Sequence, residues 1–516
     1  MSVLGKLRHR HDDELEEEKA PRVERAVRWT DDRLGLAKSA QGVLGKIFPN
    51  HWSFLLGEVA LYSFVVLLAT GVYLTFFFDP SSEIVTYSGS YEPLQGAQVS
   101  QAYASSLDLS FDVRAGLVMR QMHHWAALIF LAAITVHLMR IFFTGAFRRP
   151  RELNWIVGCT LLLLALGNGL AGYSLLDDQL SGTGLRIMYS IAISIPIAGT
   201  WIASLVFGGQ FPGESIIPRL YIIHVLLLPA AIAVLIGAHL AILVRHKHAQ
   251  FPGKLERDDN VVGERLWPTY AAKAGGYFFL VSGIIALLGG IAQINPIWIY
   301  GPFKPENVSS ASQPDWYVGW LEGALRLMPA WEINFWGFTI PNPFFPGVLL
   351  AGLTFNFLYM WPFLEARFTK DRDEHHLLQR PRDHPVRTAL GVATISFYVL
   401  LFLAGANDVI SVTFGLSINQ FVWTFRVLLF VLPPIVGLIT YRICNELVAR
   451  GRDDPPDEDD DEPTEPDLGD AADITADIEA RHANGSSDDG DSSGDRSDAG
   501  LEGEGAEAHE SEPAAT

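Results

Sequence analysis

Long apolar segments, separated by polar loops that carry most of the charge, recur between residues 51 and 441. An α-helix needs about 20 mainly apolar residues to cross a membrane, and eight segments approach or exceed that length. We therefore predict an all-α integral membrane protein with eight transmembrane helices. The expected spans are residues 51–78, 122–143, 155–173, 220–244, 275–294, 346–364, 389–404 and 422–441.

A further apolar stretch, residues 187–207, is interrupted by Pro196. A ninth crossing here would reverse the direction of the fourth span and would conflict with the charges of the loops. We interpret this stretch as a helical hairpin that lies along the outer face.

The loops alternate in positive charge. The loops 145–154, 245–273 and 365–388 contain 15 Lys and Arg residues, whereas the alternating loops contain four: Arg114, Arg186, Lys304 and Arg326. Cytoplasmic loops carry the excess of Lys and Arg. We therefore expect a multi-pass protein of the cell membrane with both termini in the cytoplasm and the long loops 79–118 and 295–343 outside.

Two of the predicted spans each carry a pair of histidines. His123 and His137 are 14 residues apart, which returns to within about 40° of the same helix face, roughly 21 Å along the axis. His224 and His239 are 15 apart and miss by about 60°, but Pro229 lies between them and can bend the helix to correct this. Two such helices side by side offer one His/His pair near each membrane face, as two bis-histidine b-type haems require.

Each histidine alone is more often a hydrogen-bonded packing residue than a ligand. Four histidines with matching offsets in two spans are harder to explain by packing, because ionisable groups at membrane depth are costly. His124 lies 13 residues from His137, about 220° around the helix, so we interpret His123 as the ligand and His124 as a neighbour without that role.

Glycines repeat at the same period in the neighbouring spans. Gly57 and Gly71 lie in the first span, and Gly158 and Gly172 in the third, each pair 14 residues apart. Glycine permits the close backbone approach that a haem between helices needs, although it also aids helix packing. We expect these four spans to form a dihaem four-helix bundle.

Two arginines flank the histidines of the second span. Arg120 precedes His123 by one turn, and Arg140 follows His137 by one turn. Each can pair with a haem propionate; anchoring to lipid headgroups is the alternative, and for Arg140 it is equally favoured.

The net charge of −20 for 516 residues comes from the C-terminal tail. After Gly451 there are 24 Asp and Glu residues against three Arg, so the rest of the chain is close to neutral. Such a segment cannot bury enough apolar surface to fold, and we predict that it is disordered. We expect four parts: a cytoplasmic segment 1–50, the dihaem bundle 51–250, a C-terminal membrane domain 251–450 and the acidic cytoplasmic tail 451–516.

The two cysteines, Cys159 and Cys444, lie on different segments. They provide no disulfide framework and no cysteine-based metal site. No Cys-x-x-Cys-His sequence occurs, so any haem is held without thioether links. The charged N-terminus lacks the apolar core of a signal peptide.

Several motifs together carry a family resemblance. They are Met-His-x-Trp around His123, Thr-Gly-Ala-Phe-Arg-Arg-Pro-Arg-Glu-Leu at 144–153, Asp-Asp-x-Leu-Ser-Gly-Thr-Gly-Leu-Arg at 177–186, Phe-Pro-Gly-Glu at 211–214 and Ser-Gln-Pro-Asp-Trp-Tyr at 312–317. With the four glycines, they resemble cytochrome b of the quinol:cytochrome c oxidoreductases, and most closely its actinobacterial form. The resemblance covers roughly residues 27–450.

The resemblance implies oxidation of a quinol, expected to be menaquinol, at an outer site. One electron leaves to a high-potential acceptor, and the other crosses from the outer haem to the inner haem and reduces quinone there. The stretch Pro314, Asp315, Trp316 and Tyr317 matches the family's Pro-Glu-Trp-Tyr motif of the outer site. A carboxylate at the edge of an apolar pocket suits proton acceptance, with Tyr317 as a second group; capping of a loop is the alternative role for Asp315.

The resemblance also implies partners, because this chain has neither a Rieske motif nor a haem-c motif. We expect a Rieske iron–sulfur subunit, a cytochrome c subunit with two haems, association with a terminal oxidase, and a homodimeric complex. No nucleic-acid partner is expected.

Two departures from the family pattern stand out. Leu176 replaces a proline expected in the outer-site loop, and Lys273 and Ala274 occupy the region where relatives carry an inner-site carboxylate. We therefore assign no residues to the inner quinone site.

Two other functions compete with this interpretation. A dihaem membrane anchor of another respiratory oxidoreductase would use similar histidine pairs, but the 295–343 loop argues against it. A transporter with a histidine proton relay would show no haem absorbance.

Overall fold

The computed structural model describes residues 29–33, 35, 42, 44–213, 215–307 and 313–453. The acidic tail beyond residue 453, which we predict to be disordered, lies outside the described residues. Most of the predicted N-terminal segment also lies outside them. The described residues up to Gly451 form one compact unit.

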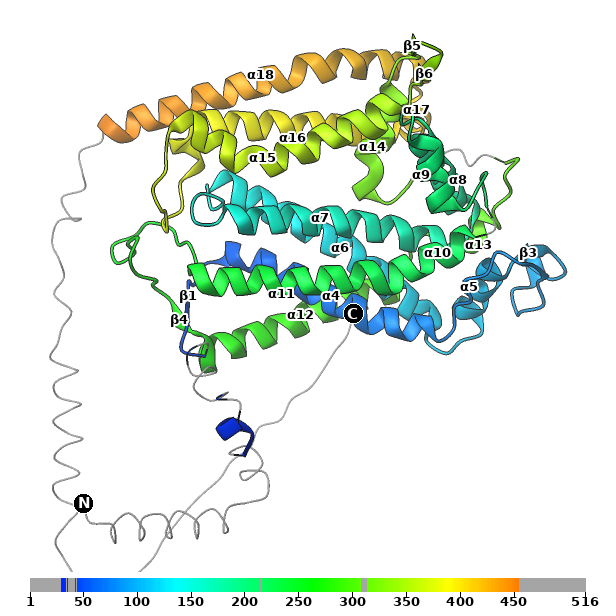
Figure 1. Cartoon of the computed structure of the whole chain (residues 1–516), viewed down its shortest axis with the longest axis horizontal. Coiled ribbons are helices and arrows are strands. Elements are labelled where there is room, and N and C mark those ends of the chain that lie inside the picture. The colour runs from blue at the N-terminus through cyan, green and yellow to red at the C-terminus, as the bar shows by residue number, and fades with distance from the viewer. Residues whose placement is uncertain are drawn as a thin grey trace, which may run out of the picture. The chain divides into compact units, whose positions relative to one another are not determined.

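Eight helices in the described part of the chain are long and apolar enough to cross a membrane, which confirms the predicted number. They lie side by side in Figure 1. The spans are α4 (Leu55–Thr75), α6 (Gly116–Phe143), α7 (Glu152–Tyr173), α10 (Ile216–Ile222) continued by α11 (Leu228–His246), α12 (Ala271–Ile291), α15 (Ala351–Thr369), α16 (Pro385–Gly405) and α18 (Ile418–Asp453).

The first four spans pack in pairs. α4 lies along α6, α11 lies along α7, and α12 covers α4 and α6 from outside this group. The core between them contains Phe64 of α4, Phe130 and Leu131 of α6, and Leu162 of α7. Because these helices are apolar on every face, they can pack against one another and against lipid.

The connections after the first, third, fifth and seventh spans contain six shorter α-helices. They are α5 (Gln101–Phe111), α8 (Gln179–Ile193), α9 (Gly199–Phe207), α13 (Ile297–Tyr300), α14 (Trp316–Leu327) and α17 (Asn407–Phe414). Helices α8 and α9 pack against each other, so the stretch 187–207 belongs to a helical hairpin, as predicted. The turn between them contains Pro196, where a helix without its backbone N–H donor cannot continue.

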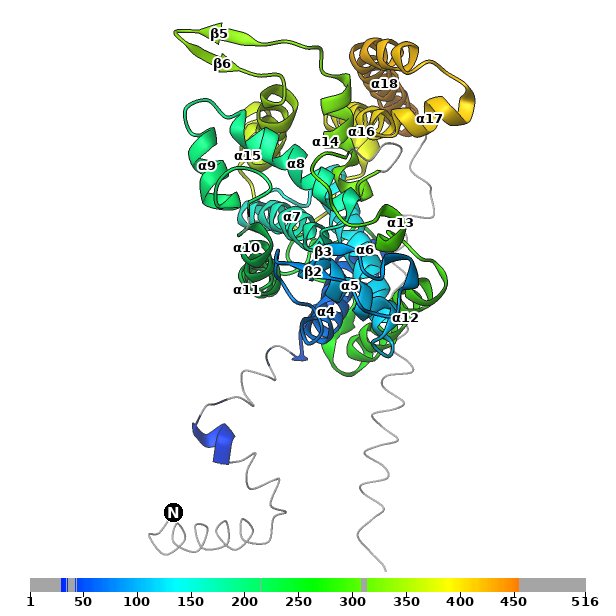
Figure 2. The same cartoon turned by 90° about the vertical axis from the view of Figure 1, so that its right-hand side faces the viewer.

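Three short antiparallel strand pairs complete the fold. β1 (Ile47–Phe48) pairs with β4 (Glu264–Arg265), and β2 (Ile84–Thr86) pairs with β3 (Gln98–Ser100). The third pair is the hairpin β5–β6 (Ile333–Phe335, Phe338–Ile340), which extends away from the helices in Figure 2. The first pair joins the segment before the first span to the segment before the fifth.

Helix α14 is held tightly against α16. An added Cβ at Gly323 would lie 1.7 Å from the carbonyl oxygen of Leu401, and one at Gly405 would lie 2.5 Å from that of Gly319. Only glycine permits this backbone approach. The packing fixes the start of α14, where Asp315 lies.

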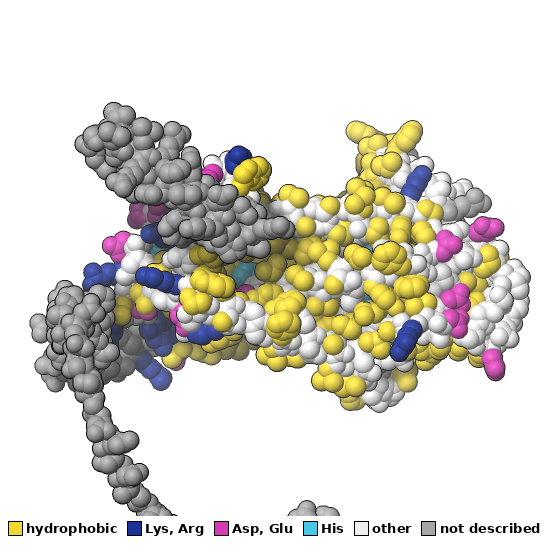
Figure 3. Space-filling view, turned by 90° about the horizontal axis from the view of Figure 1, so that it is seen from below, with side chains coloured by type: hydrophobic (Ala, Val, Ile, Leu, Met, Phe, Trp, Pro, Cys, Tyr) yellow, Lys and Arg dark blue, Asp and Glu magenta, His cyan; other side chains and the backbone are white. Residues whose placement is uncertain are grey.

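Charge is unevenly distributed over the surface. In the view of Figure 3, hydrophobic side chains cover the middle of the face, most Lys and Arg side chains gather at one end, and the Asp and Glu side chains are prominent at the other. This distribution matches a membrane protein whose basic loops share one side.

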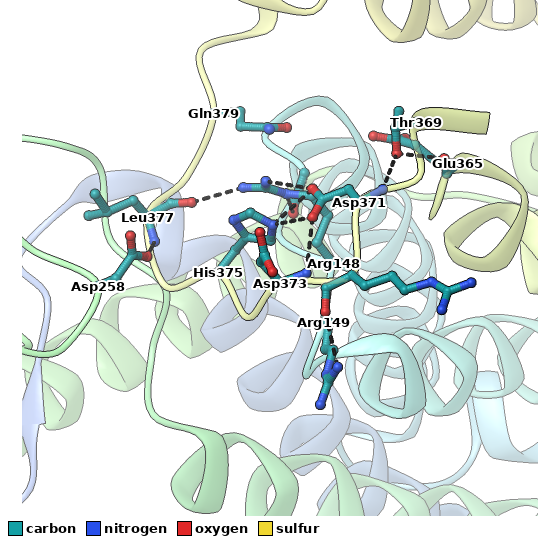
Figure 4. Close-up of polar contacts among 12 residues, drawn as sticks. Arg148, Arg149, Asp258, Glu365, Thr369, Asp371, Asp373, His375, Leu377 and Gln379 are labelled. Atoms are coloured by element: carbon teal, nitrogen blue, oxygen red, sulfur yellow. Dashed lines mark hydrogen bonds and ion pairs between the residues drawn. The ribbon is translucent and has the colours of Figure 1, made fainter. Parts of the chain in front are cut away.

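The basic loops contact one another (Figure 4). Arg148 lies 3.8 Å from the Asp371 carboxylate, which is also 2.8 Å from Nε2 of His375. The Asp258 carboxylate accepts hydrogen bonds from the backbone N–H of His376 at 2.7 Å and of Leu377 at 3.0 Å. The N–H of His376 lowers the pKa of Asp258 most. These contacts join the loops 145–154, 245–273 and 365–388 into one layer.

Candidate functional site

The structure brings the four histidines of the second and fourth spans together in two pairs. His123 of α6 lies opposite His224, with ring centroids 6.0 Å apart and ring planes at 79°. His137 of α6 lies opposite His239 of α11, with centroids 6.5 Å apart and planes at 73°. Two metal–imidazole bonds of about 2 Å each, with roughly 1 Å from each ligating nitrogen to its ring centroid, place two axial imidazoles about 6 Å apart. Both pairs therefore fit the axial ligation of a haem iron.

The 15-residue spacing in the fourth span is accommodated by a π-helical turn, Ile223–Leu227, rather than by a bend at Pro229 alone. The backbone N–H of Leu228 bonds to the carbonyl of Ile223, five residues earlier. A π-helical turn absorbs one extra residue, so a spacing of 15 acts like 14. Pro229 contributes because it has no N–H to donate to the preceding turn. Both histidines can therefore face α6.

The first pair is oriented by hydrogen bonds to its outer ring nitrogens. Nδ1 of His123 lies 2.9 Å from the hydroxyl of Thr70, and Nδ1 of His224 lies 3.0 Å from the carbonyl oxygen of Asn168. A donor bond from Nδ1 to a carbonyl leaves the lone pair of Nε2 free for a metal. This arrangement is typical of an imidazole that ligates iron.

Each pair lines its own cavity. Cavity A, of about 240 Å³, is lined by His123, His224 and Arg120, and cavity B, of about 350 Å³, by His137 and His239. The side chain of Phe130 lines both cavities. The two sites are therefore separated by an aromatic side chain and the packing around it.

The predicted glycines lie where the imidazoles approach the neighbouring helices. An added Cβ would lie 3.3 Å from Cε1 of His137 at Gly57 and 3.2 Å from Cε1 of His123 at Gly71. At Gly172 it would lie 2.3 Å from Cε1 of His224. At Gly158 the distance to Cε1 of His239 is 3.8 Å, which is ordinary contact. All four line the cavities, and Gly172 tolerates a side chain least.

Both predicted arginines line the cavities and keep part of their guanidinium groups unpaired. Arg120 is buried; one of its nitrogens lies 3.4 Å from the carbonyl of Asn295, and its Nε and Nη2 have no hydrogen-bond partner among the described residues. Nε of Arg140 donates to Ser53 at 3.3 Å, and its Nη2 has no partner in the described part of the chain. A buried, unpaired guanidinium is costly. Each therefore suits an anionic group such as a haem propionate.

A polar cluster centred on the Asp315 carboxylate lies at the wall of cavity A. Nε2 of His124 lies 2.8 Å from one Asp315 oxygen and 2.9 Å from the other, and the amide of Asn295 donates at 3.2 Å. The Tyr317 hydroxyl donates to the same carboxylate at 3.1 Å. His124, which the sequence led us to set aside as a haem ligand, contacts this second candidate site. His124 lies about 220° around α6 from His137, so its ring faces α14.

Asp315 begins α14 but does not cap it, because its side chain makes no capping hydrogen bond. Its carboxylate is 9% exposed. Tyr317 is buried; burial first, and then the Asp315 charge, raise its pKa well above the usual value, so the phenol stays a hydrogen-bond donor. The Tyr317 hydroxyl approaches α7 at Gly169, where an added Cβ would lie 2.7 Å from it. Asp315 and Tyr317 line cavity A, whereas Trp316 packs into the apolar core and Pro314 precedes the helix.

Cavity B contains a carboxylate that the sequence reading missed. Glu58 of α4 lines the cavity, and hydroxyl groups of Tyr62 and Tyr270 donate to its two oxygens. Lys273, noted for its position near the start of the fifth span, forms an ion pair with Glu264 and is 55% exposed. The signal that could have found Glu58 is a lone carboxylate inside an apolar span, which is functional by default.

Comparisons with known proteins agree with this geometry. A protein family described as "Cytochrome b(N-terminal)/b6/petB" matches residues 128–302. The chain is 52% identical over 435 residues to the "Cytochrome bc1 complex cytochrome b subunit" of Streptomyces coelicolor, which covers 84% of this chain and 80% of that protein. The protein of the same name from Mycobacterium tuberculosis is 56% identical over 415 residues, covering 80% and 75%.

One solved structure supports the fold. A chain of a "Hyperthermophilic respiratory Complex III" superimposes with a TM-score of 0.56 at 21% identity, covering 80% of this chain and 99% of that chain.

Proposed function

Because the chain belongs to the cytochrome b subunits of the cytochrome bc1 complex, we propose that His123 and His224 hold one b-type haem and His137 and His239 hold a second. The subunit is part of the catalytic core of a quinol:cytochrome c oxidoreductase, and its family binds haem b and quinone. The observation that carries the proposal is the presence of two facing imidazole pairs at ligation distance, each in its own cavity. When bound, the haems carry single electrons between the two sides of the membrane.

The remaining cavity residues position these groups. Arg120 in cavity A and Arg140 in cavity B each offer an unpaired guanidinium nitrogen to a propionate. Gly57, Gly71, Gly158 and Gly172 leave the space in which the imidazoles lie against α4 and α7 and in which a haem would be held.

In this proposal the outer quinol site lies beside the haem space of cavity A, where Asp315 and Tyr317 line the cavity wall. Oxidation of a quinol releases two protons, and an oxygen of Asp315 accepts one of them at the cavity wall. His124 and Asn295 hold the carboxylate by hydrogen bonds and keep it directed into the cavity. Tyr317 remains protonated and donates either to Asp315 or to the quinol oxygen. Pro314 and Trp316 set the start of α14.

We propose the following assembly and orientation. The basic layer faces the cytoplasm, so both termini are cytoplasmic in the cell membrane. The spans within residues 51–250 act as the haem-binding bundle. The spans within residues 251–450 form the domain that supplies the outer quinol-site loop. The partner subunits are a Rieske iron–sulfur protein and a cytochrome c with two haems, in a homodimeric complex that associates with a terminal oxidase. The substrate is menaquinol.

A reduced-minus-oxidised absorbance spectrum of the purified protein tests the haem assignment. We expect two b-type components, both extractable without breaking a covalent link. His123→Ala should remove one component and His137→Ala the other, while His384→Ala, outside both cavities, should leave both. If His123→Ala and His137→Ala removed the same component, the pairing would be wrong.

A further inference from the structure

The hairpin β5–β6 has one apolar face and one polar face. Its register places Ile333 opposite Ile340, Asn334 opposite Thr339, and Phe335 opposite Phe338. Opposed side chains of an antiparallel pair point to the same side of the sheet, and the sides alternate along each strand. The apolar face therefore consists of Ile333, Phe335, Phe338 and Ile340, and the polar face contains Asn334 and Thr339.

The apolar face is largely open. The rings of Phe335 and Phe338 contact each other, with centroids 6.3 Å apart, yet they are 44% and 50% exposed, and Ile333 is 48% exposed. On the polar face the hydroxyl of Thr339 donates to the side-chain oxygen of Asn334 at 2.6 Å. A two-stranded hairpin is only marginally stable in water. A surface outside this chain is therefore needed to cover the apolar face.

The turn of the hairpin holds a tryptophan in a backbone conformation that favours glycine. Trp336 has a φ of 45° and Gly337 a φ of 81°. Turns of this kind usually have Asn, Asp or Gly at the first position, and a bulky residue there is strained. The Trp336 side chain is also 95% exposed. Because the chain itself gives this ring almost no packing, a contact outside the chain must offset the strain.

The hairpin lies near the membrane surface on the side opposite the basic layer. Figure 1 places it at the end of the helix group that contains α9 and α17, and Figure 2 shows it extending sideways from that end. The side-chain amide of Asn342 donates to the carbonyl of Pro329 and closes the base of the hairpin. The sixth span begins at Phe345, five residues after Ile340, a distance of about 17 Å at most for an extended chain. The hairpin therefore stays close to the membrane.

The composition of this segment is typical of a membrane–water interface. Residues 329–344 contain five aromatic residues and one charged residue, Glu332. Tryptophan is enriched at this depth because its ring is apolar and its N–H is polar. Helix α9 lies on the same side of the molecule in Figure 2 and exposes Trp201 and Leu205, which are one turn apart. Two elements from different connections thus present a tryptophan at this surface.

We propose that the hairpin β5–β6 is an interfacial membrane anchor, with its apolar face and Trp336 in the headgroup region of the leaflet opposite the basic layer and its polar face toward water. Lipid, rather than another subunit, covers the apolar face. Residues 329–344 contain no Lys or Arg, so the anchoring comes from apolar burial and needs no anionic headgroup. It holds the connection between α14 and α15 at a fixed depth and depends on neither haem binding nor quinol chemistry.

The test is spin labelling of the intact complex in phosphatidylcholine nanodiscs. The variants are Phe335→Cys and Phe338→Cys on the apolar face and Asn334→Cys and Thr339→Cys on the polar face. A nitroxide on each cysteine is relaxed by collision with oxygen, which concentrates in lipid, or with a neutral nickel chelate, which stays in water. The oxygen-to-nickel ratio therefore reports whether each position faces lipid or water.

Two reference variants calibrate this ratio. Phe430→Cys, at an exposed position of α18 within the eighth span, gives the value for lipid. Glu92→Cys, at an exposed position in the connection after the first span, gives the value for water. The native Cys159 and Cys444 are buried, and the unsubstituted complex provides the background signal.

We expect the two labels on the apolar face to match the lipid reference and the two on the polar face to match the water reference. This alternation with a period of two requires the hairpin to lie flat on the lipid surface. Strong nickel relaxation at all four positions would show that the hairpin stands in water. Weak relaxation by both reagents at Phe335→Cys and Phe338→Cys would show that a protein subunit covers the apolar face. Either result overturns the proposal.

Trp336→Gly tests the tip independently, because glycine adopts the positive φ without strain and should tighten the turn if the ring has no partner. If the ring is buried in lipid, its loss should make the amides of β5 and β6 exchange with deuterium about tenfold faster or more in the nanodiscs. Trp336→Phe should keep most of the protection, because it still buries an aromatic ring. Unchanged or slower exchange in Trp336→Gly would contradict the anchoring role of the tip.

Discussion

Gly172→Ala should selectively weaken the outer haem site. In the present structure the new Cβ would lie 2.3 Å from Cε1 of His224, so the imidazole or the helix must move by about 1 Å to reach ordinary contact. Overpacking of this kind costs about 1–3 kcal/mol. At 1.4 kcal/mol per tenfold, haem affinity at this site should fall by about fivefold to about 140-fold.

Gly158→Ala is the matched control for this prediction. It adds the same methyl group at the equivalent position against His239, where the distance of 3.8 Å leaves room. The assay is haem titration of the purified, haem-depleted complex, followed in the two spectral components. Full occupancy of the outer component in Gly172→Ala at limiting haem, or an equal loss of the inner component in Gly158→Ala, would refute the steric reasoning.

Four further outcomes are expected. His123→Ala or His224→Ala should remove the outer haem spectrum while the inner one still forms; loss of both components would contradict independent sites. Asp315→Asn should slow quinol oxidation with both haems in place, and Asp315→Glu should retain most activity; wild-type turnover of the Asn variant across pH 6 to 8 would remove Asp315 from the mechanism. Truncation after Arg450 should leave haem content and quinol oxidation intact, and a large loss in the assembled complex would show that the tail takes part. Burial raises the pKa of Asp177 to about 6, above an unfolded value of about 3.9. The neutral carboxyl therefore makes its full contribution to folding stability below pH 4, and this contribution is lost as the pH rises to 6. Asp177→Asn should therefore raise the free energy of unfolding at pH 8 by up to about 3 kcal/mol, measured as a higher thermal midpoint, with no gain at pH 4; an equal gain at both pH values would indicate another cause.

The sequence by itself determined the features that depend on local pattern. Runs of about 20 apolar residues can satisfy their backbone only as helices in lipid, so eight spans and the 187–207 hairpin followed from hydropathy and Pro196. The 14-residue period of His123 and His137 is a property of one helix and could be read directly. Its counterpart at His224 and His239 could be identified as a pair, but the π-helical turn that aligns them could not, because it depends on backbone hydrogen bonds around Pro229.

Only the tertiary structure decided which side chains from distant segments share a cavity. His124 and Asp315 are 191 residues apart, and their contact depends on how α14 packs against α16 and beside α6. Glu58 and Tyr270 are 212 residues apart and meet because β1 pairs with β4. Periodicity places a residue on a face of its own helix, but it carries no information about which element covers that face. The facing histidines could therefore be predicted from the chain, whereas the polar side chains that share their cavities required the packing of helices that are far apart in sequence.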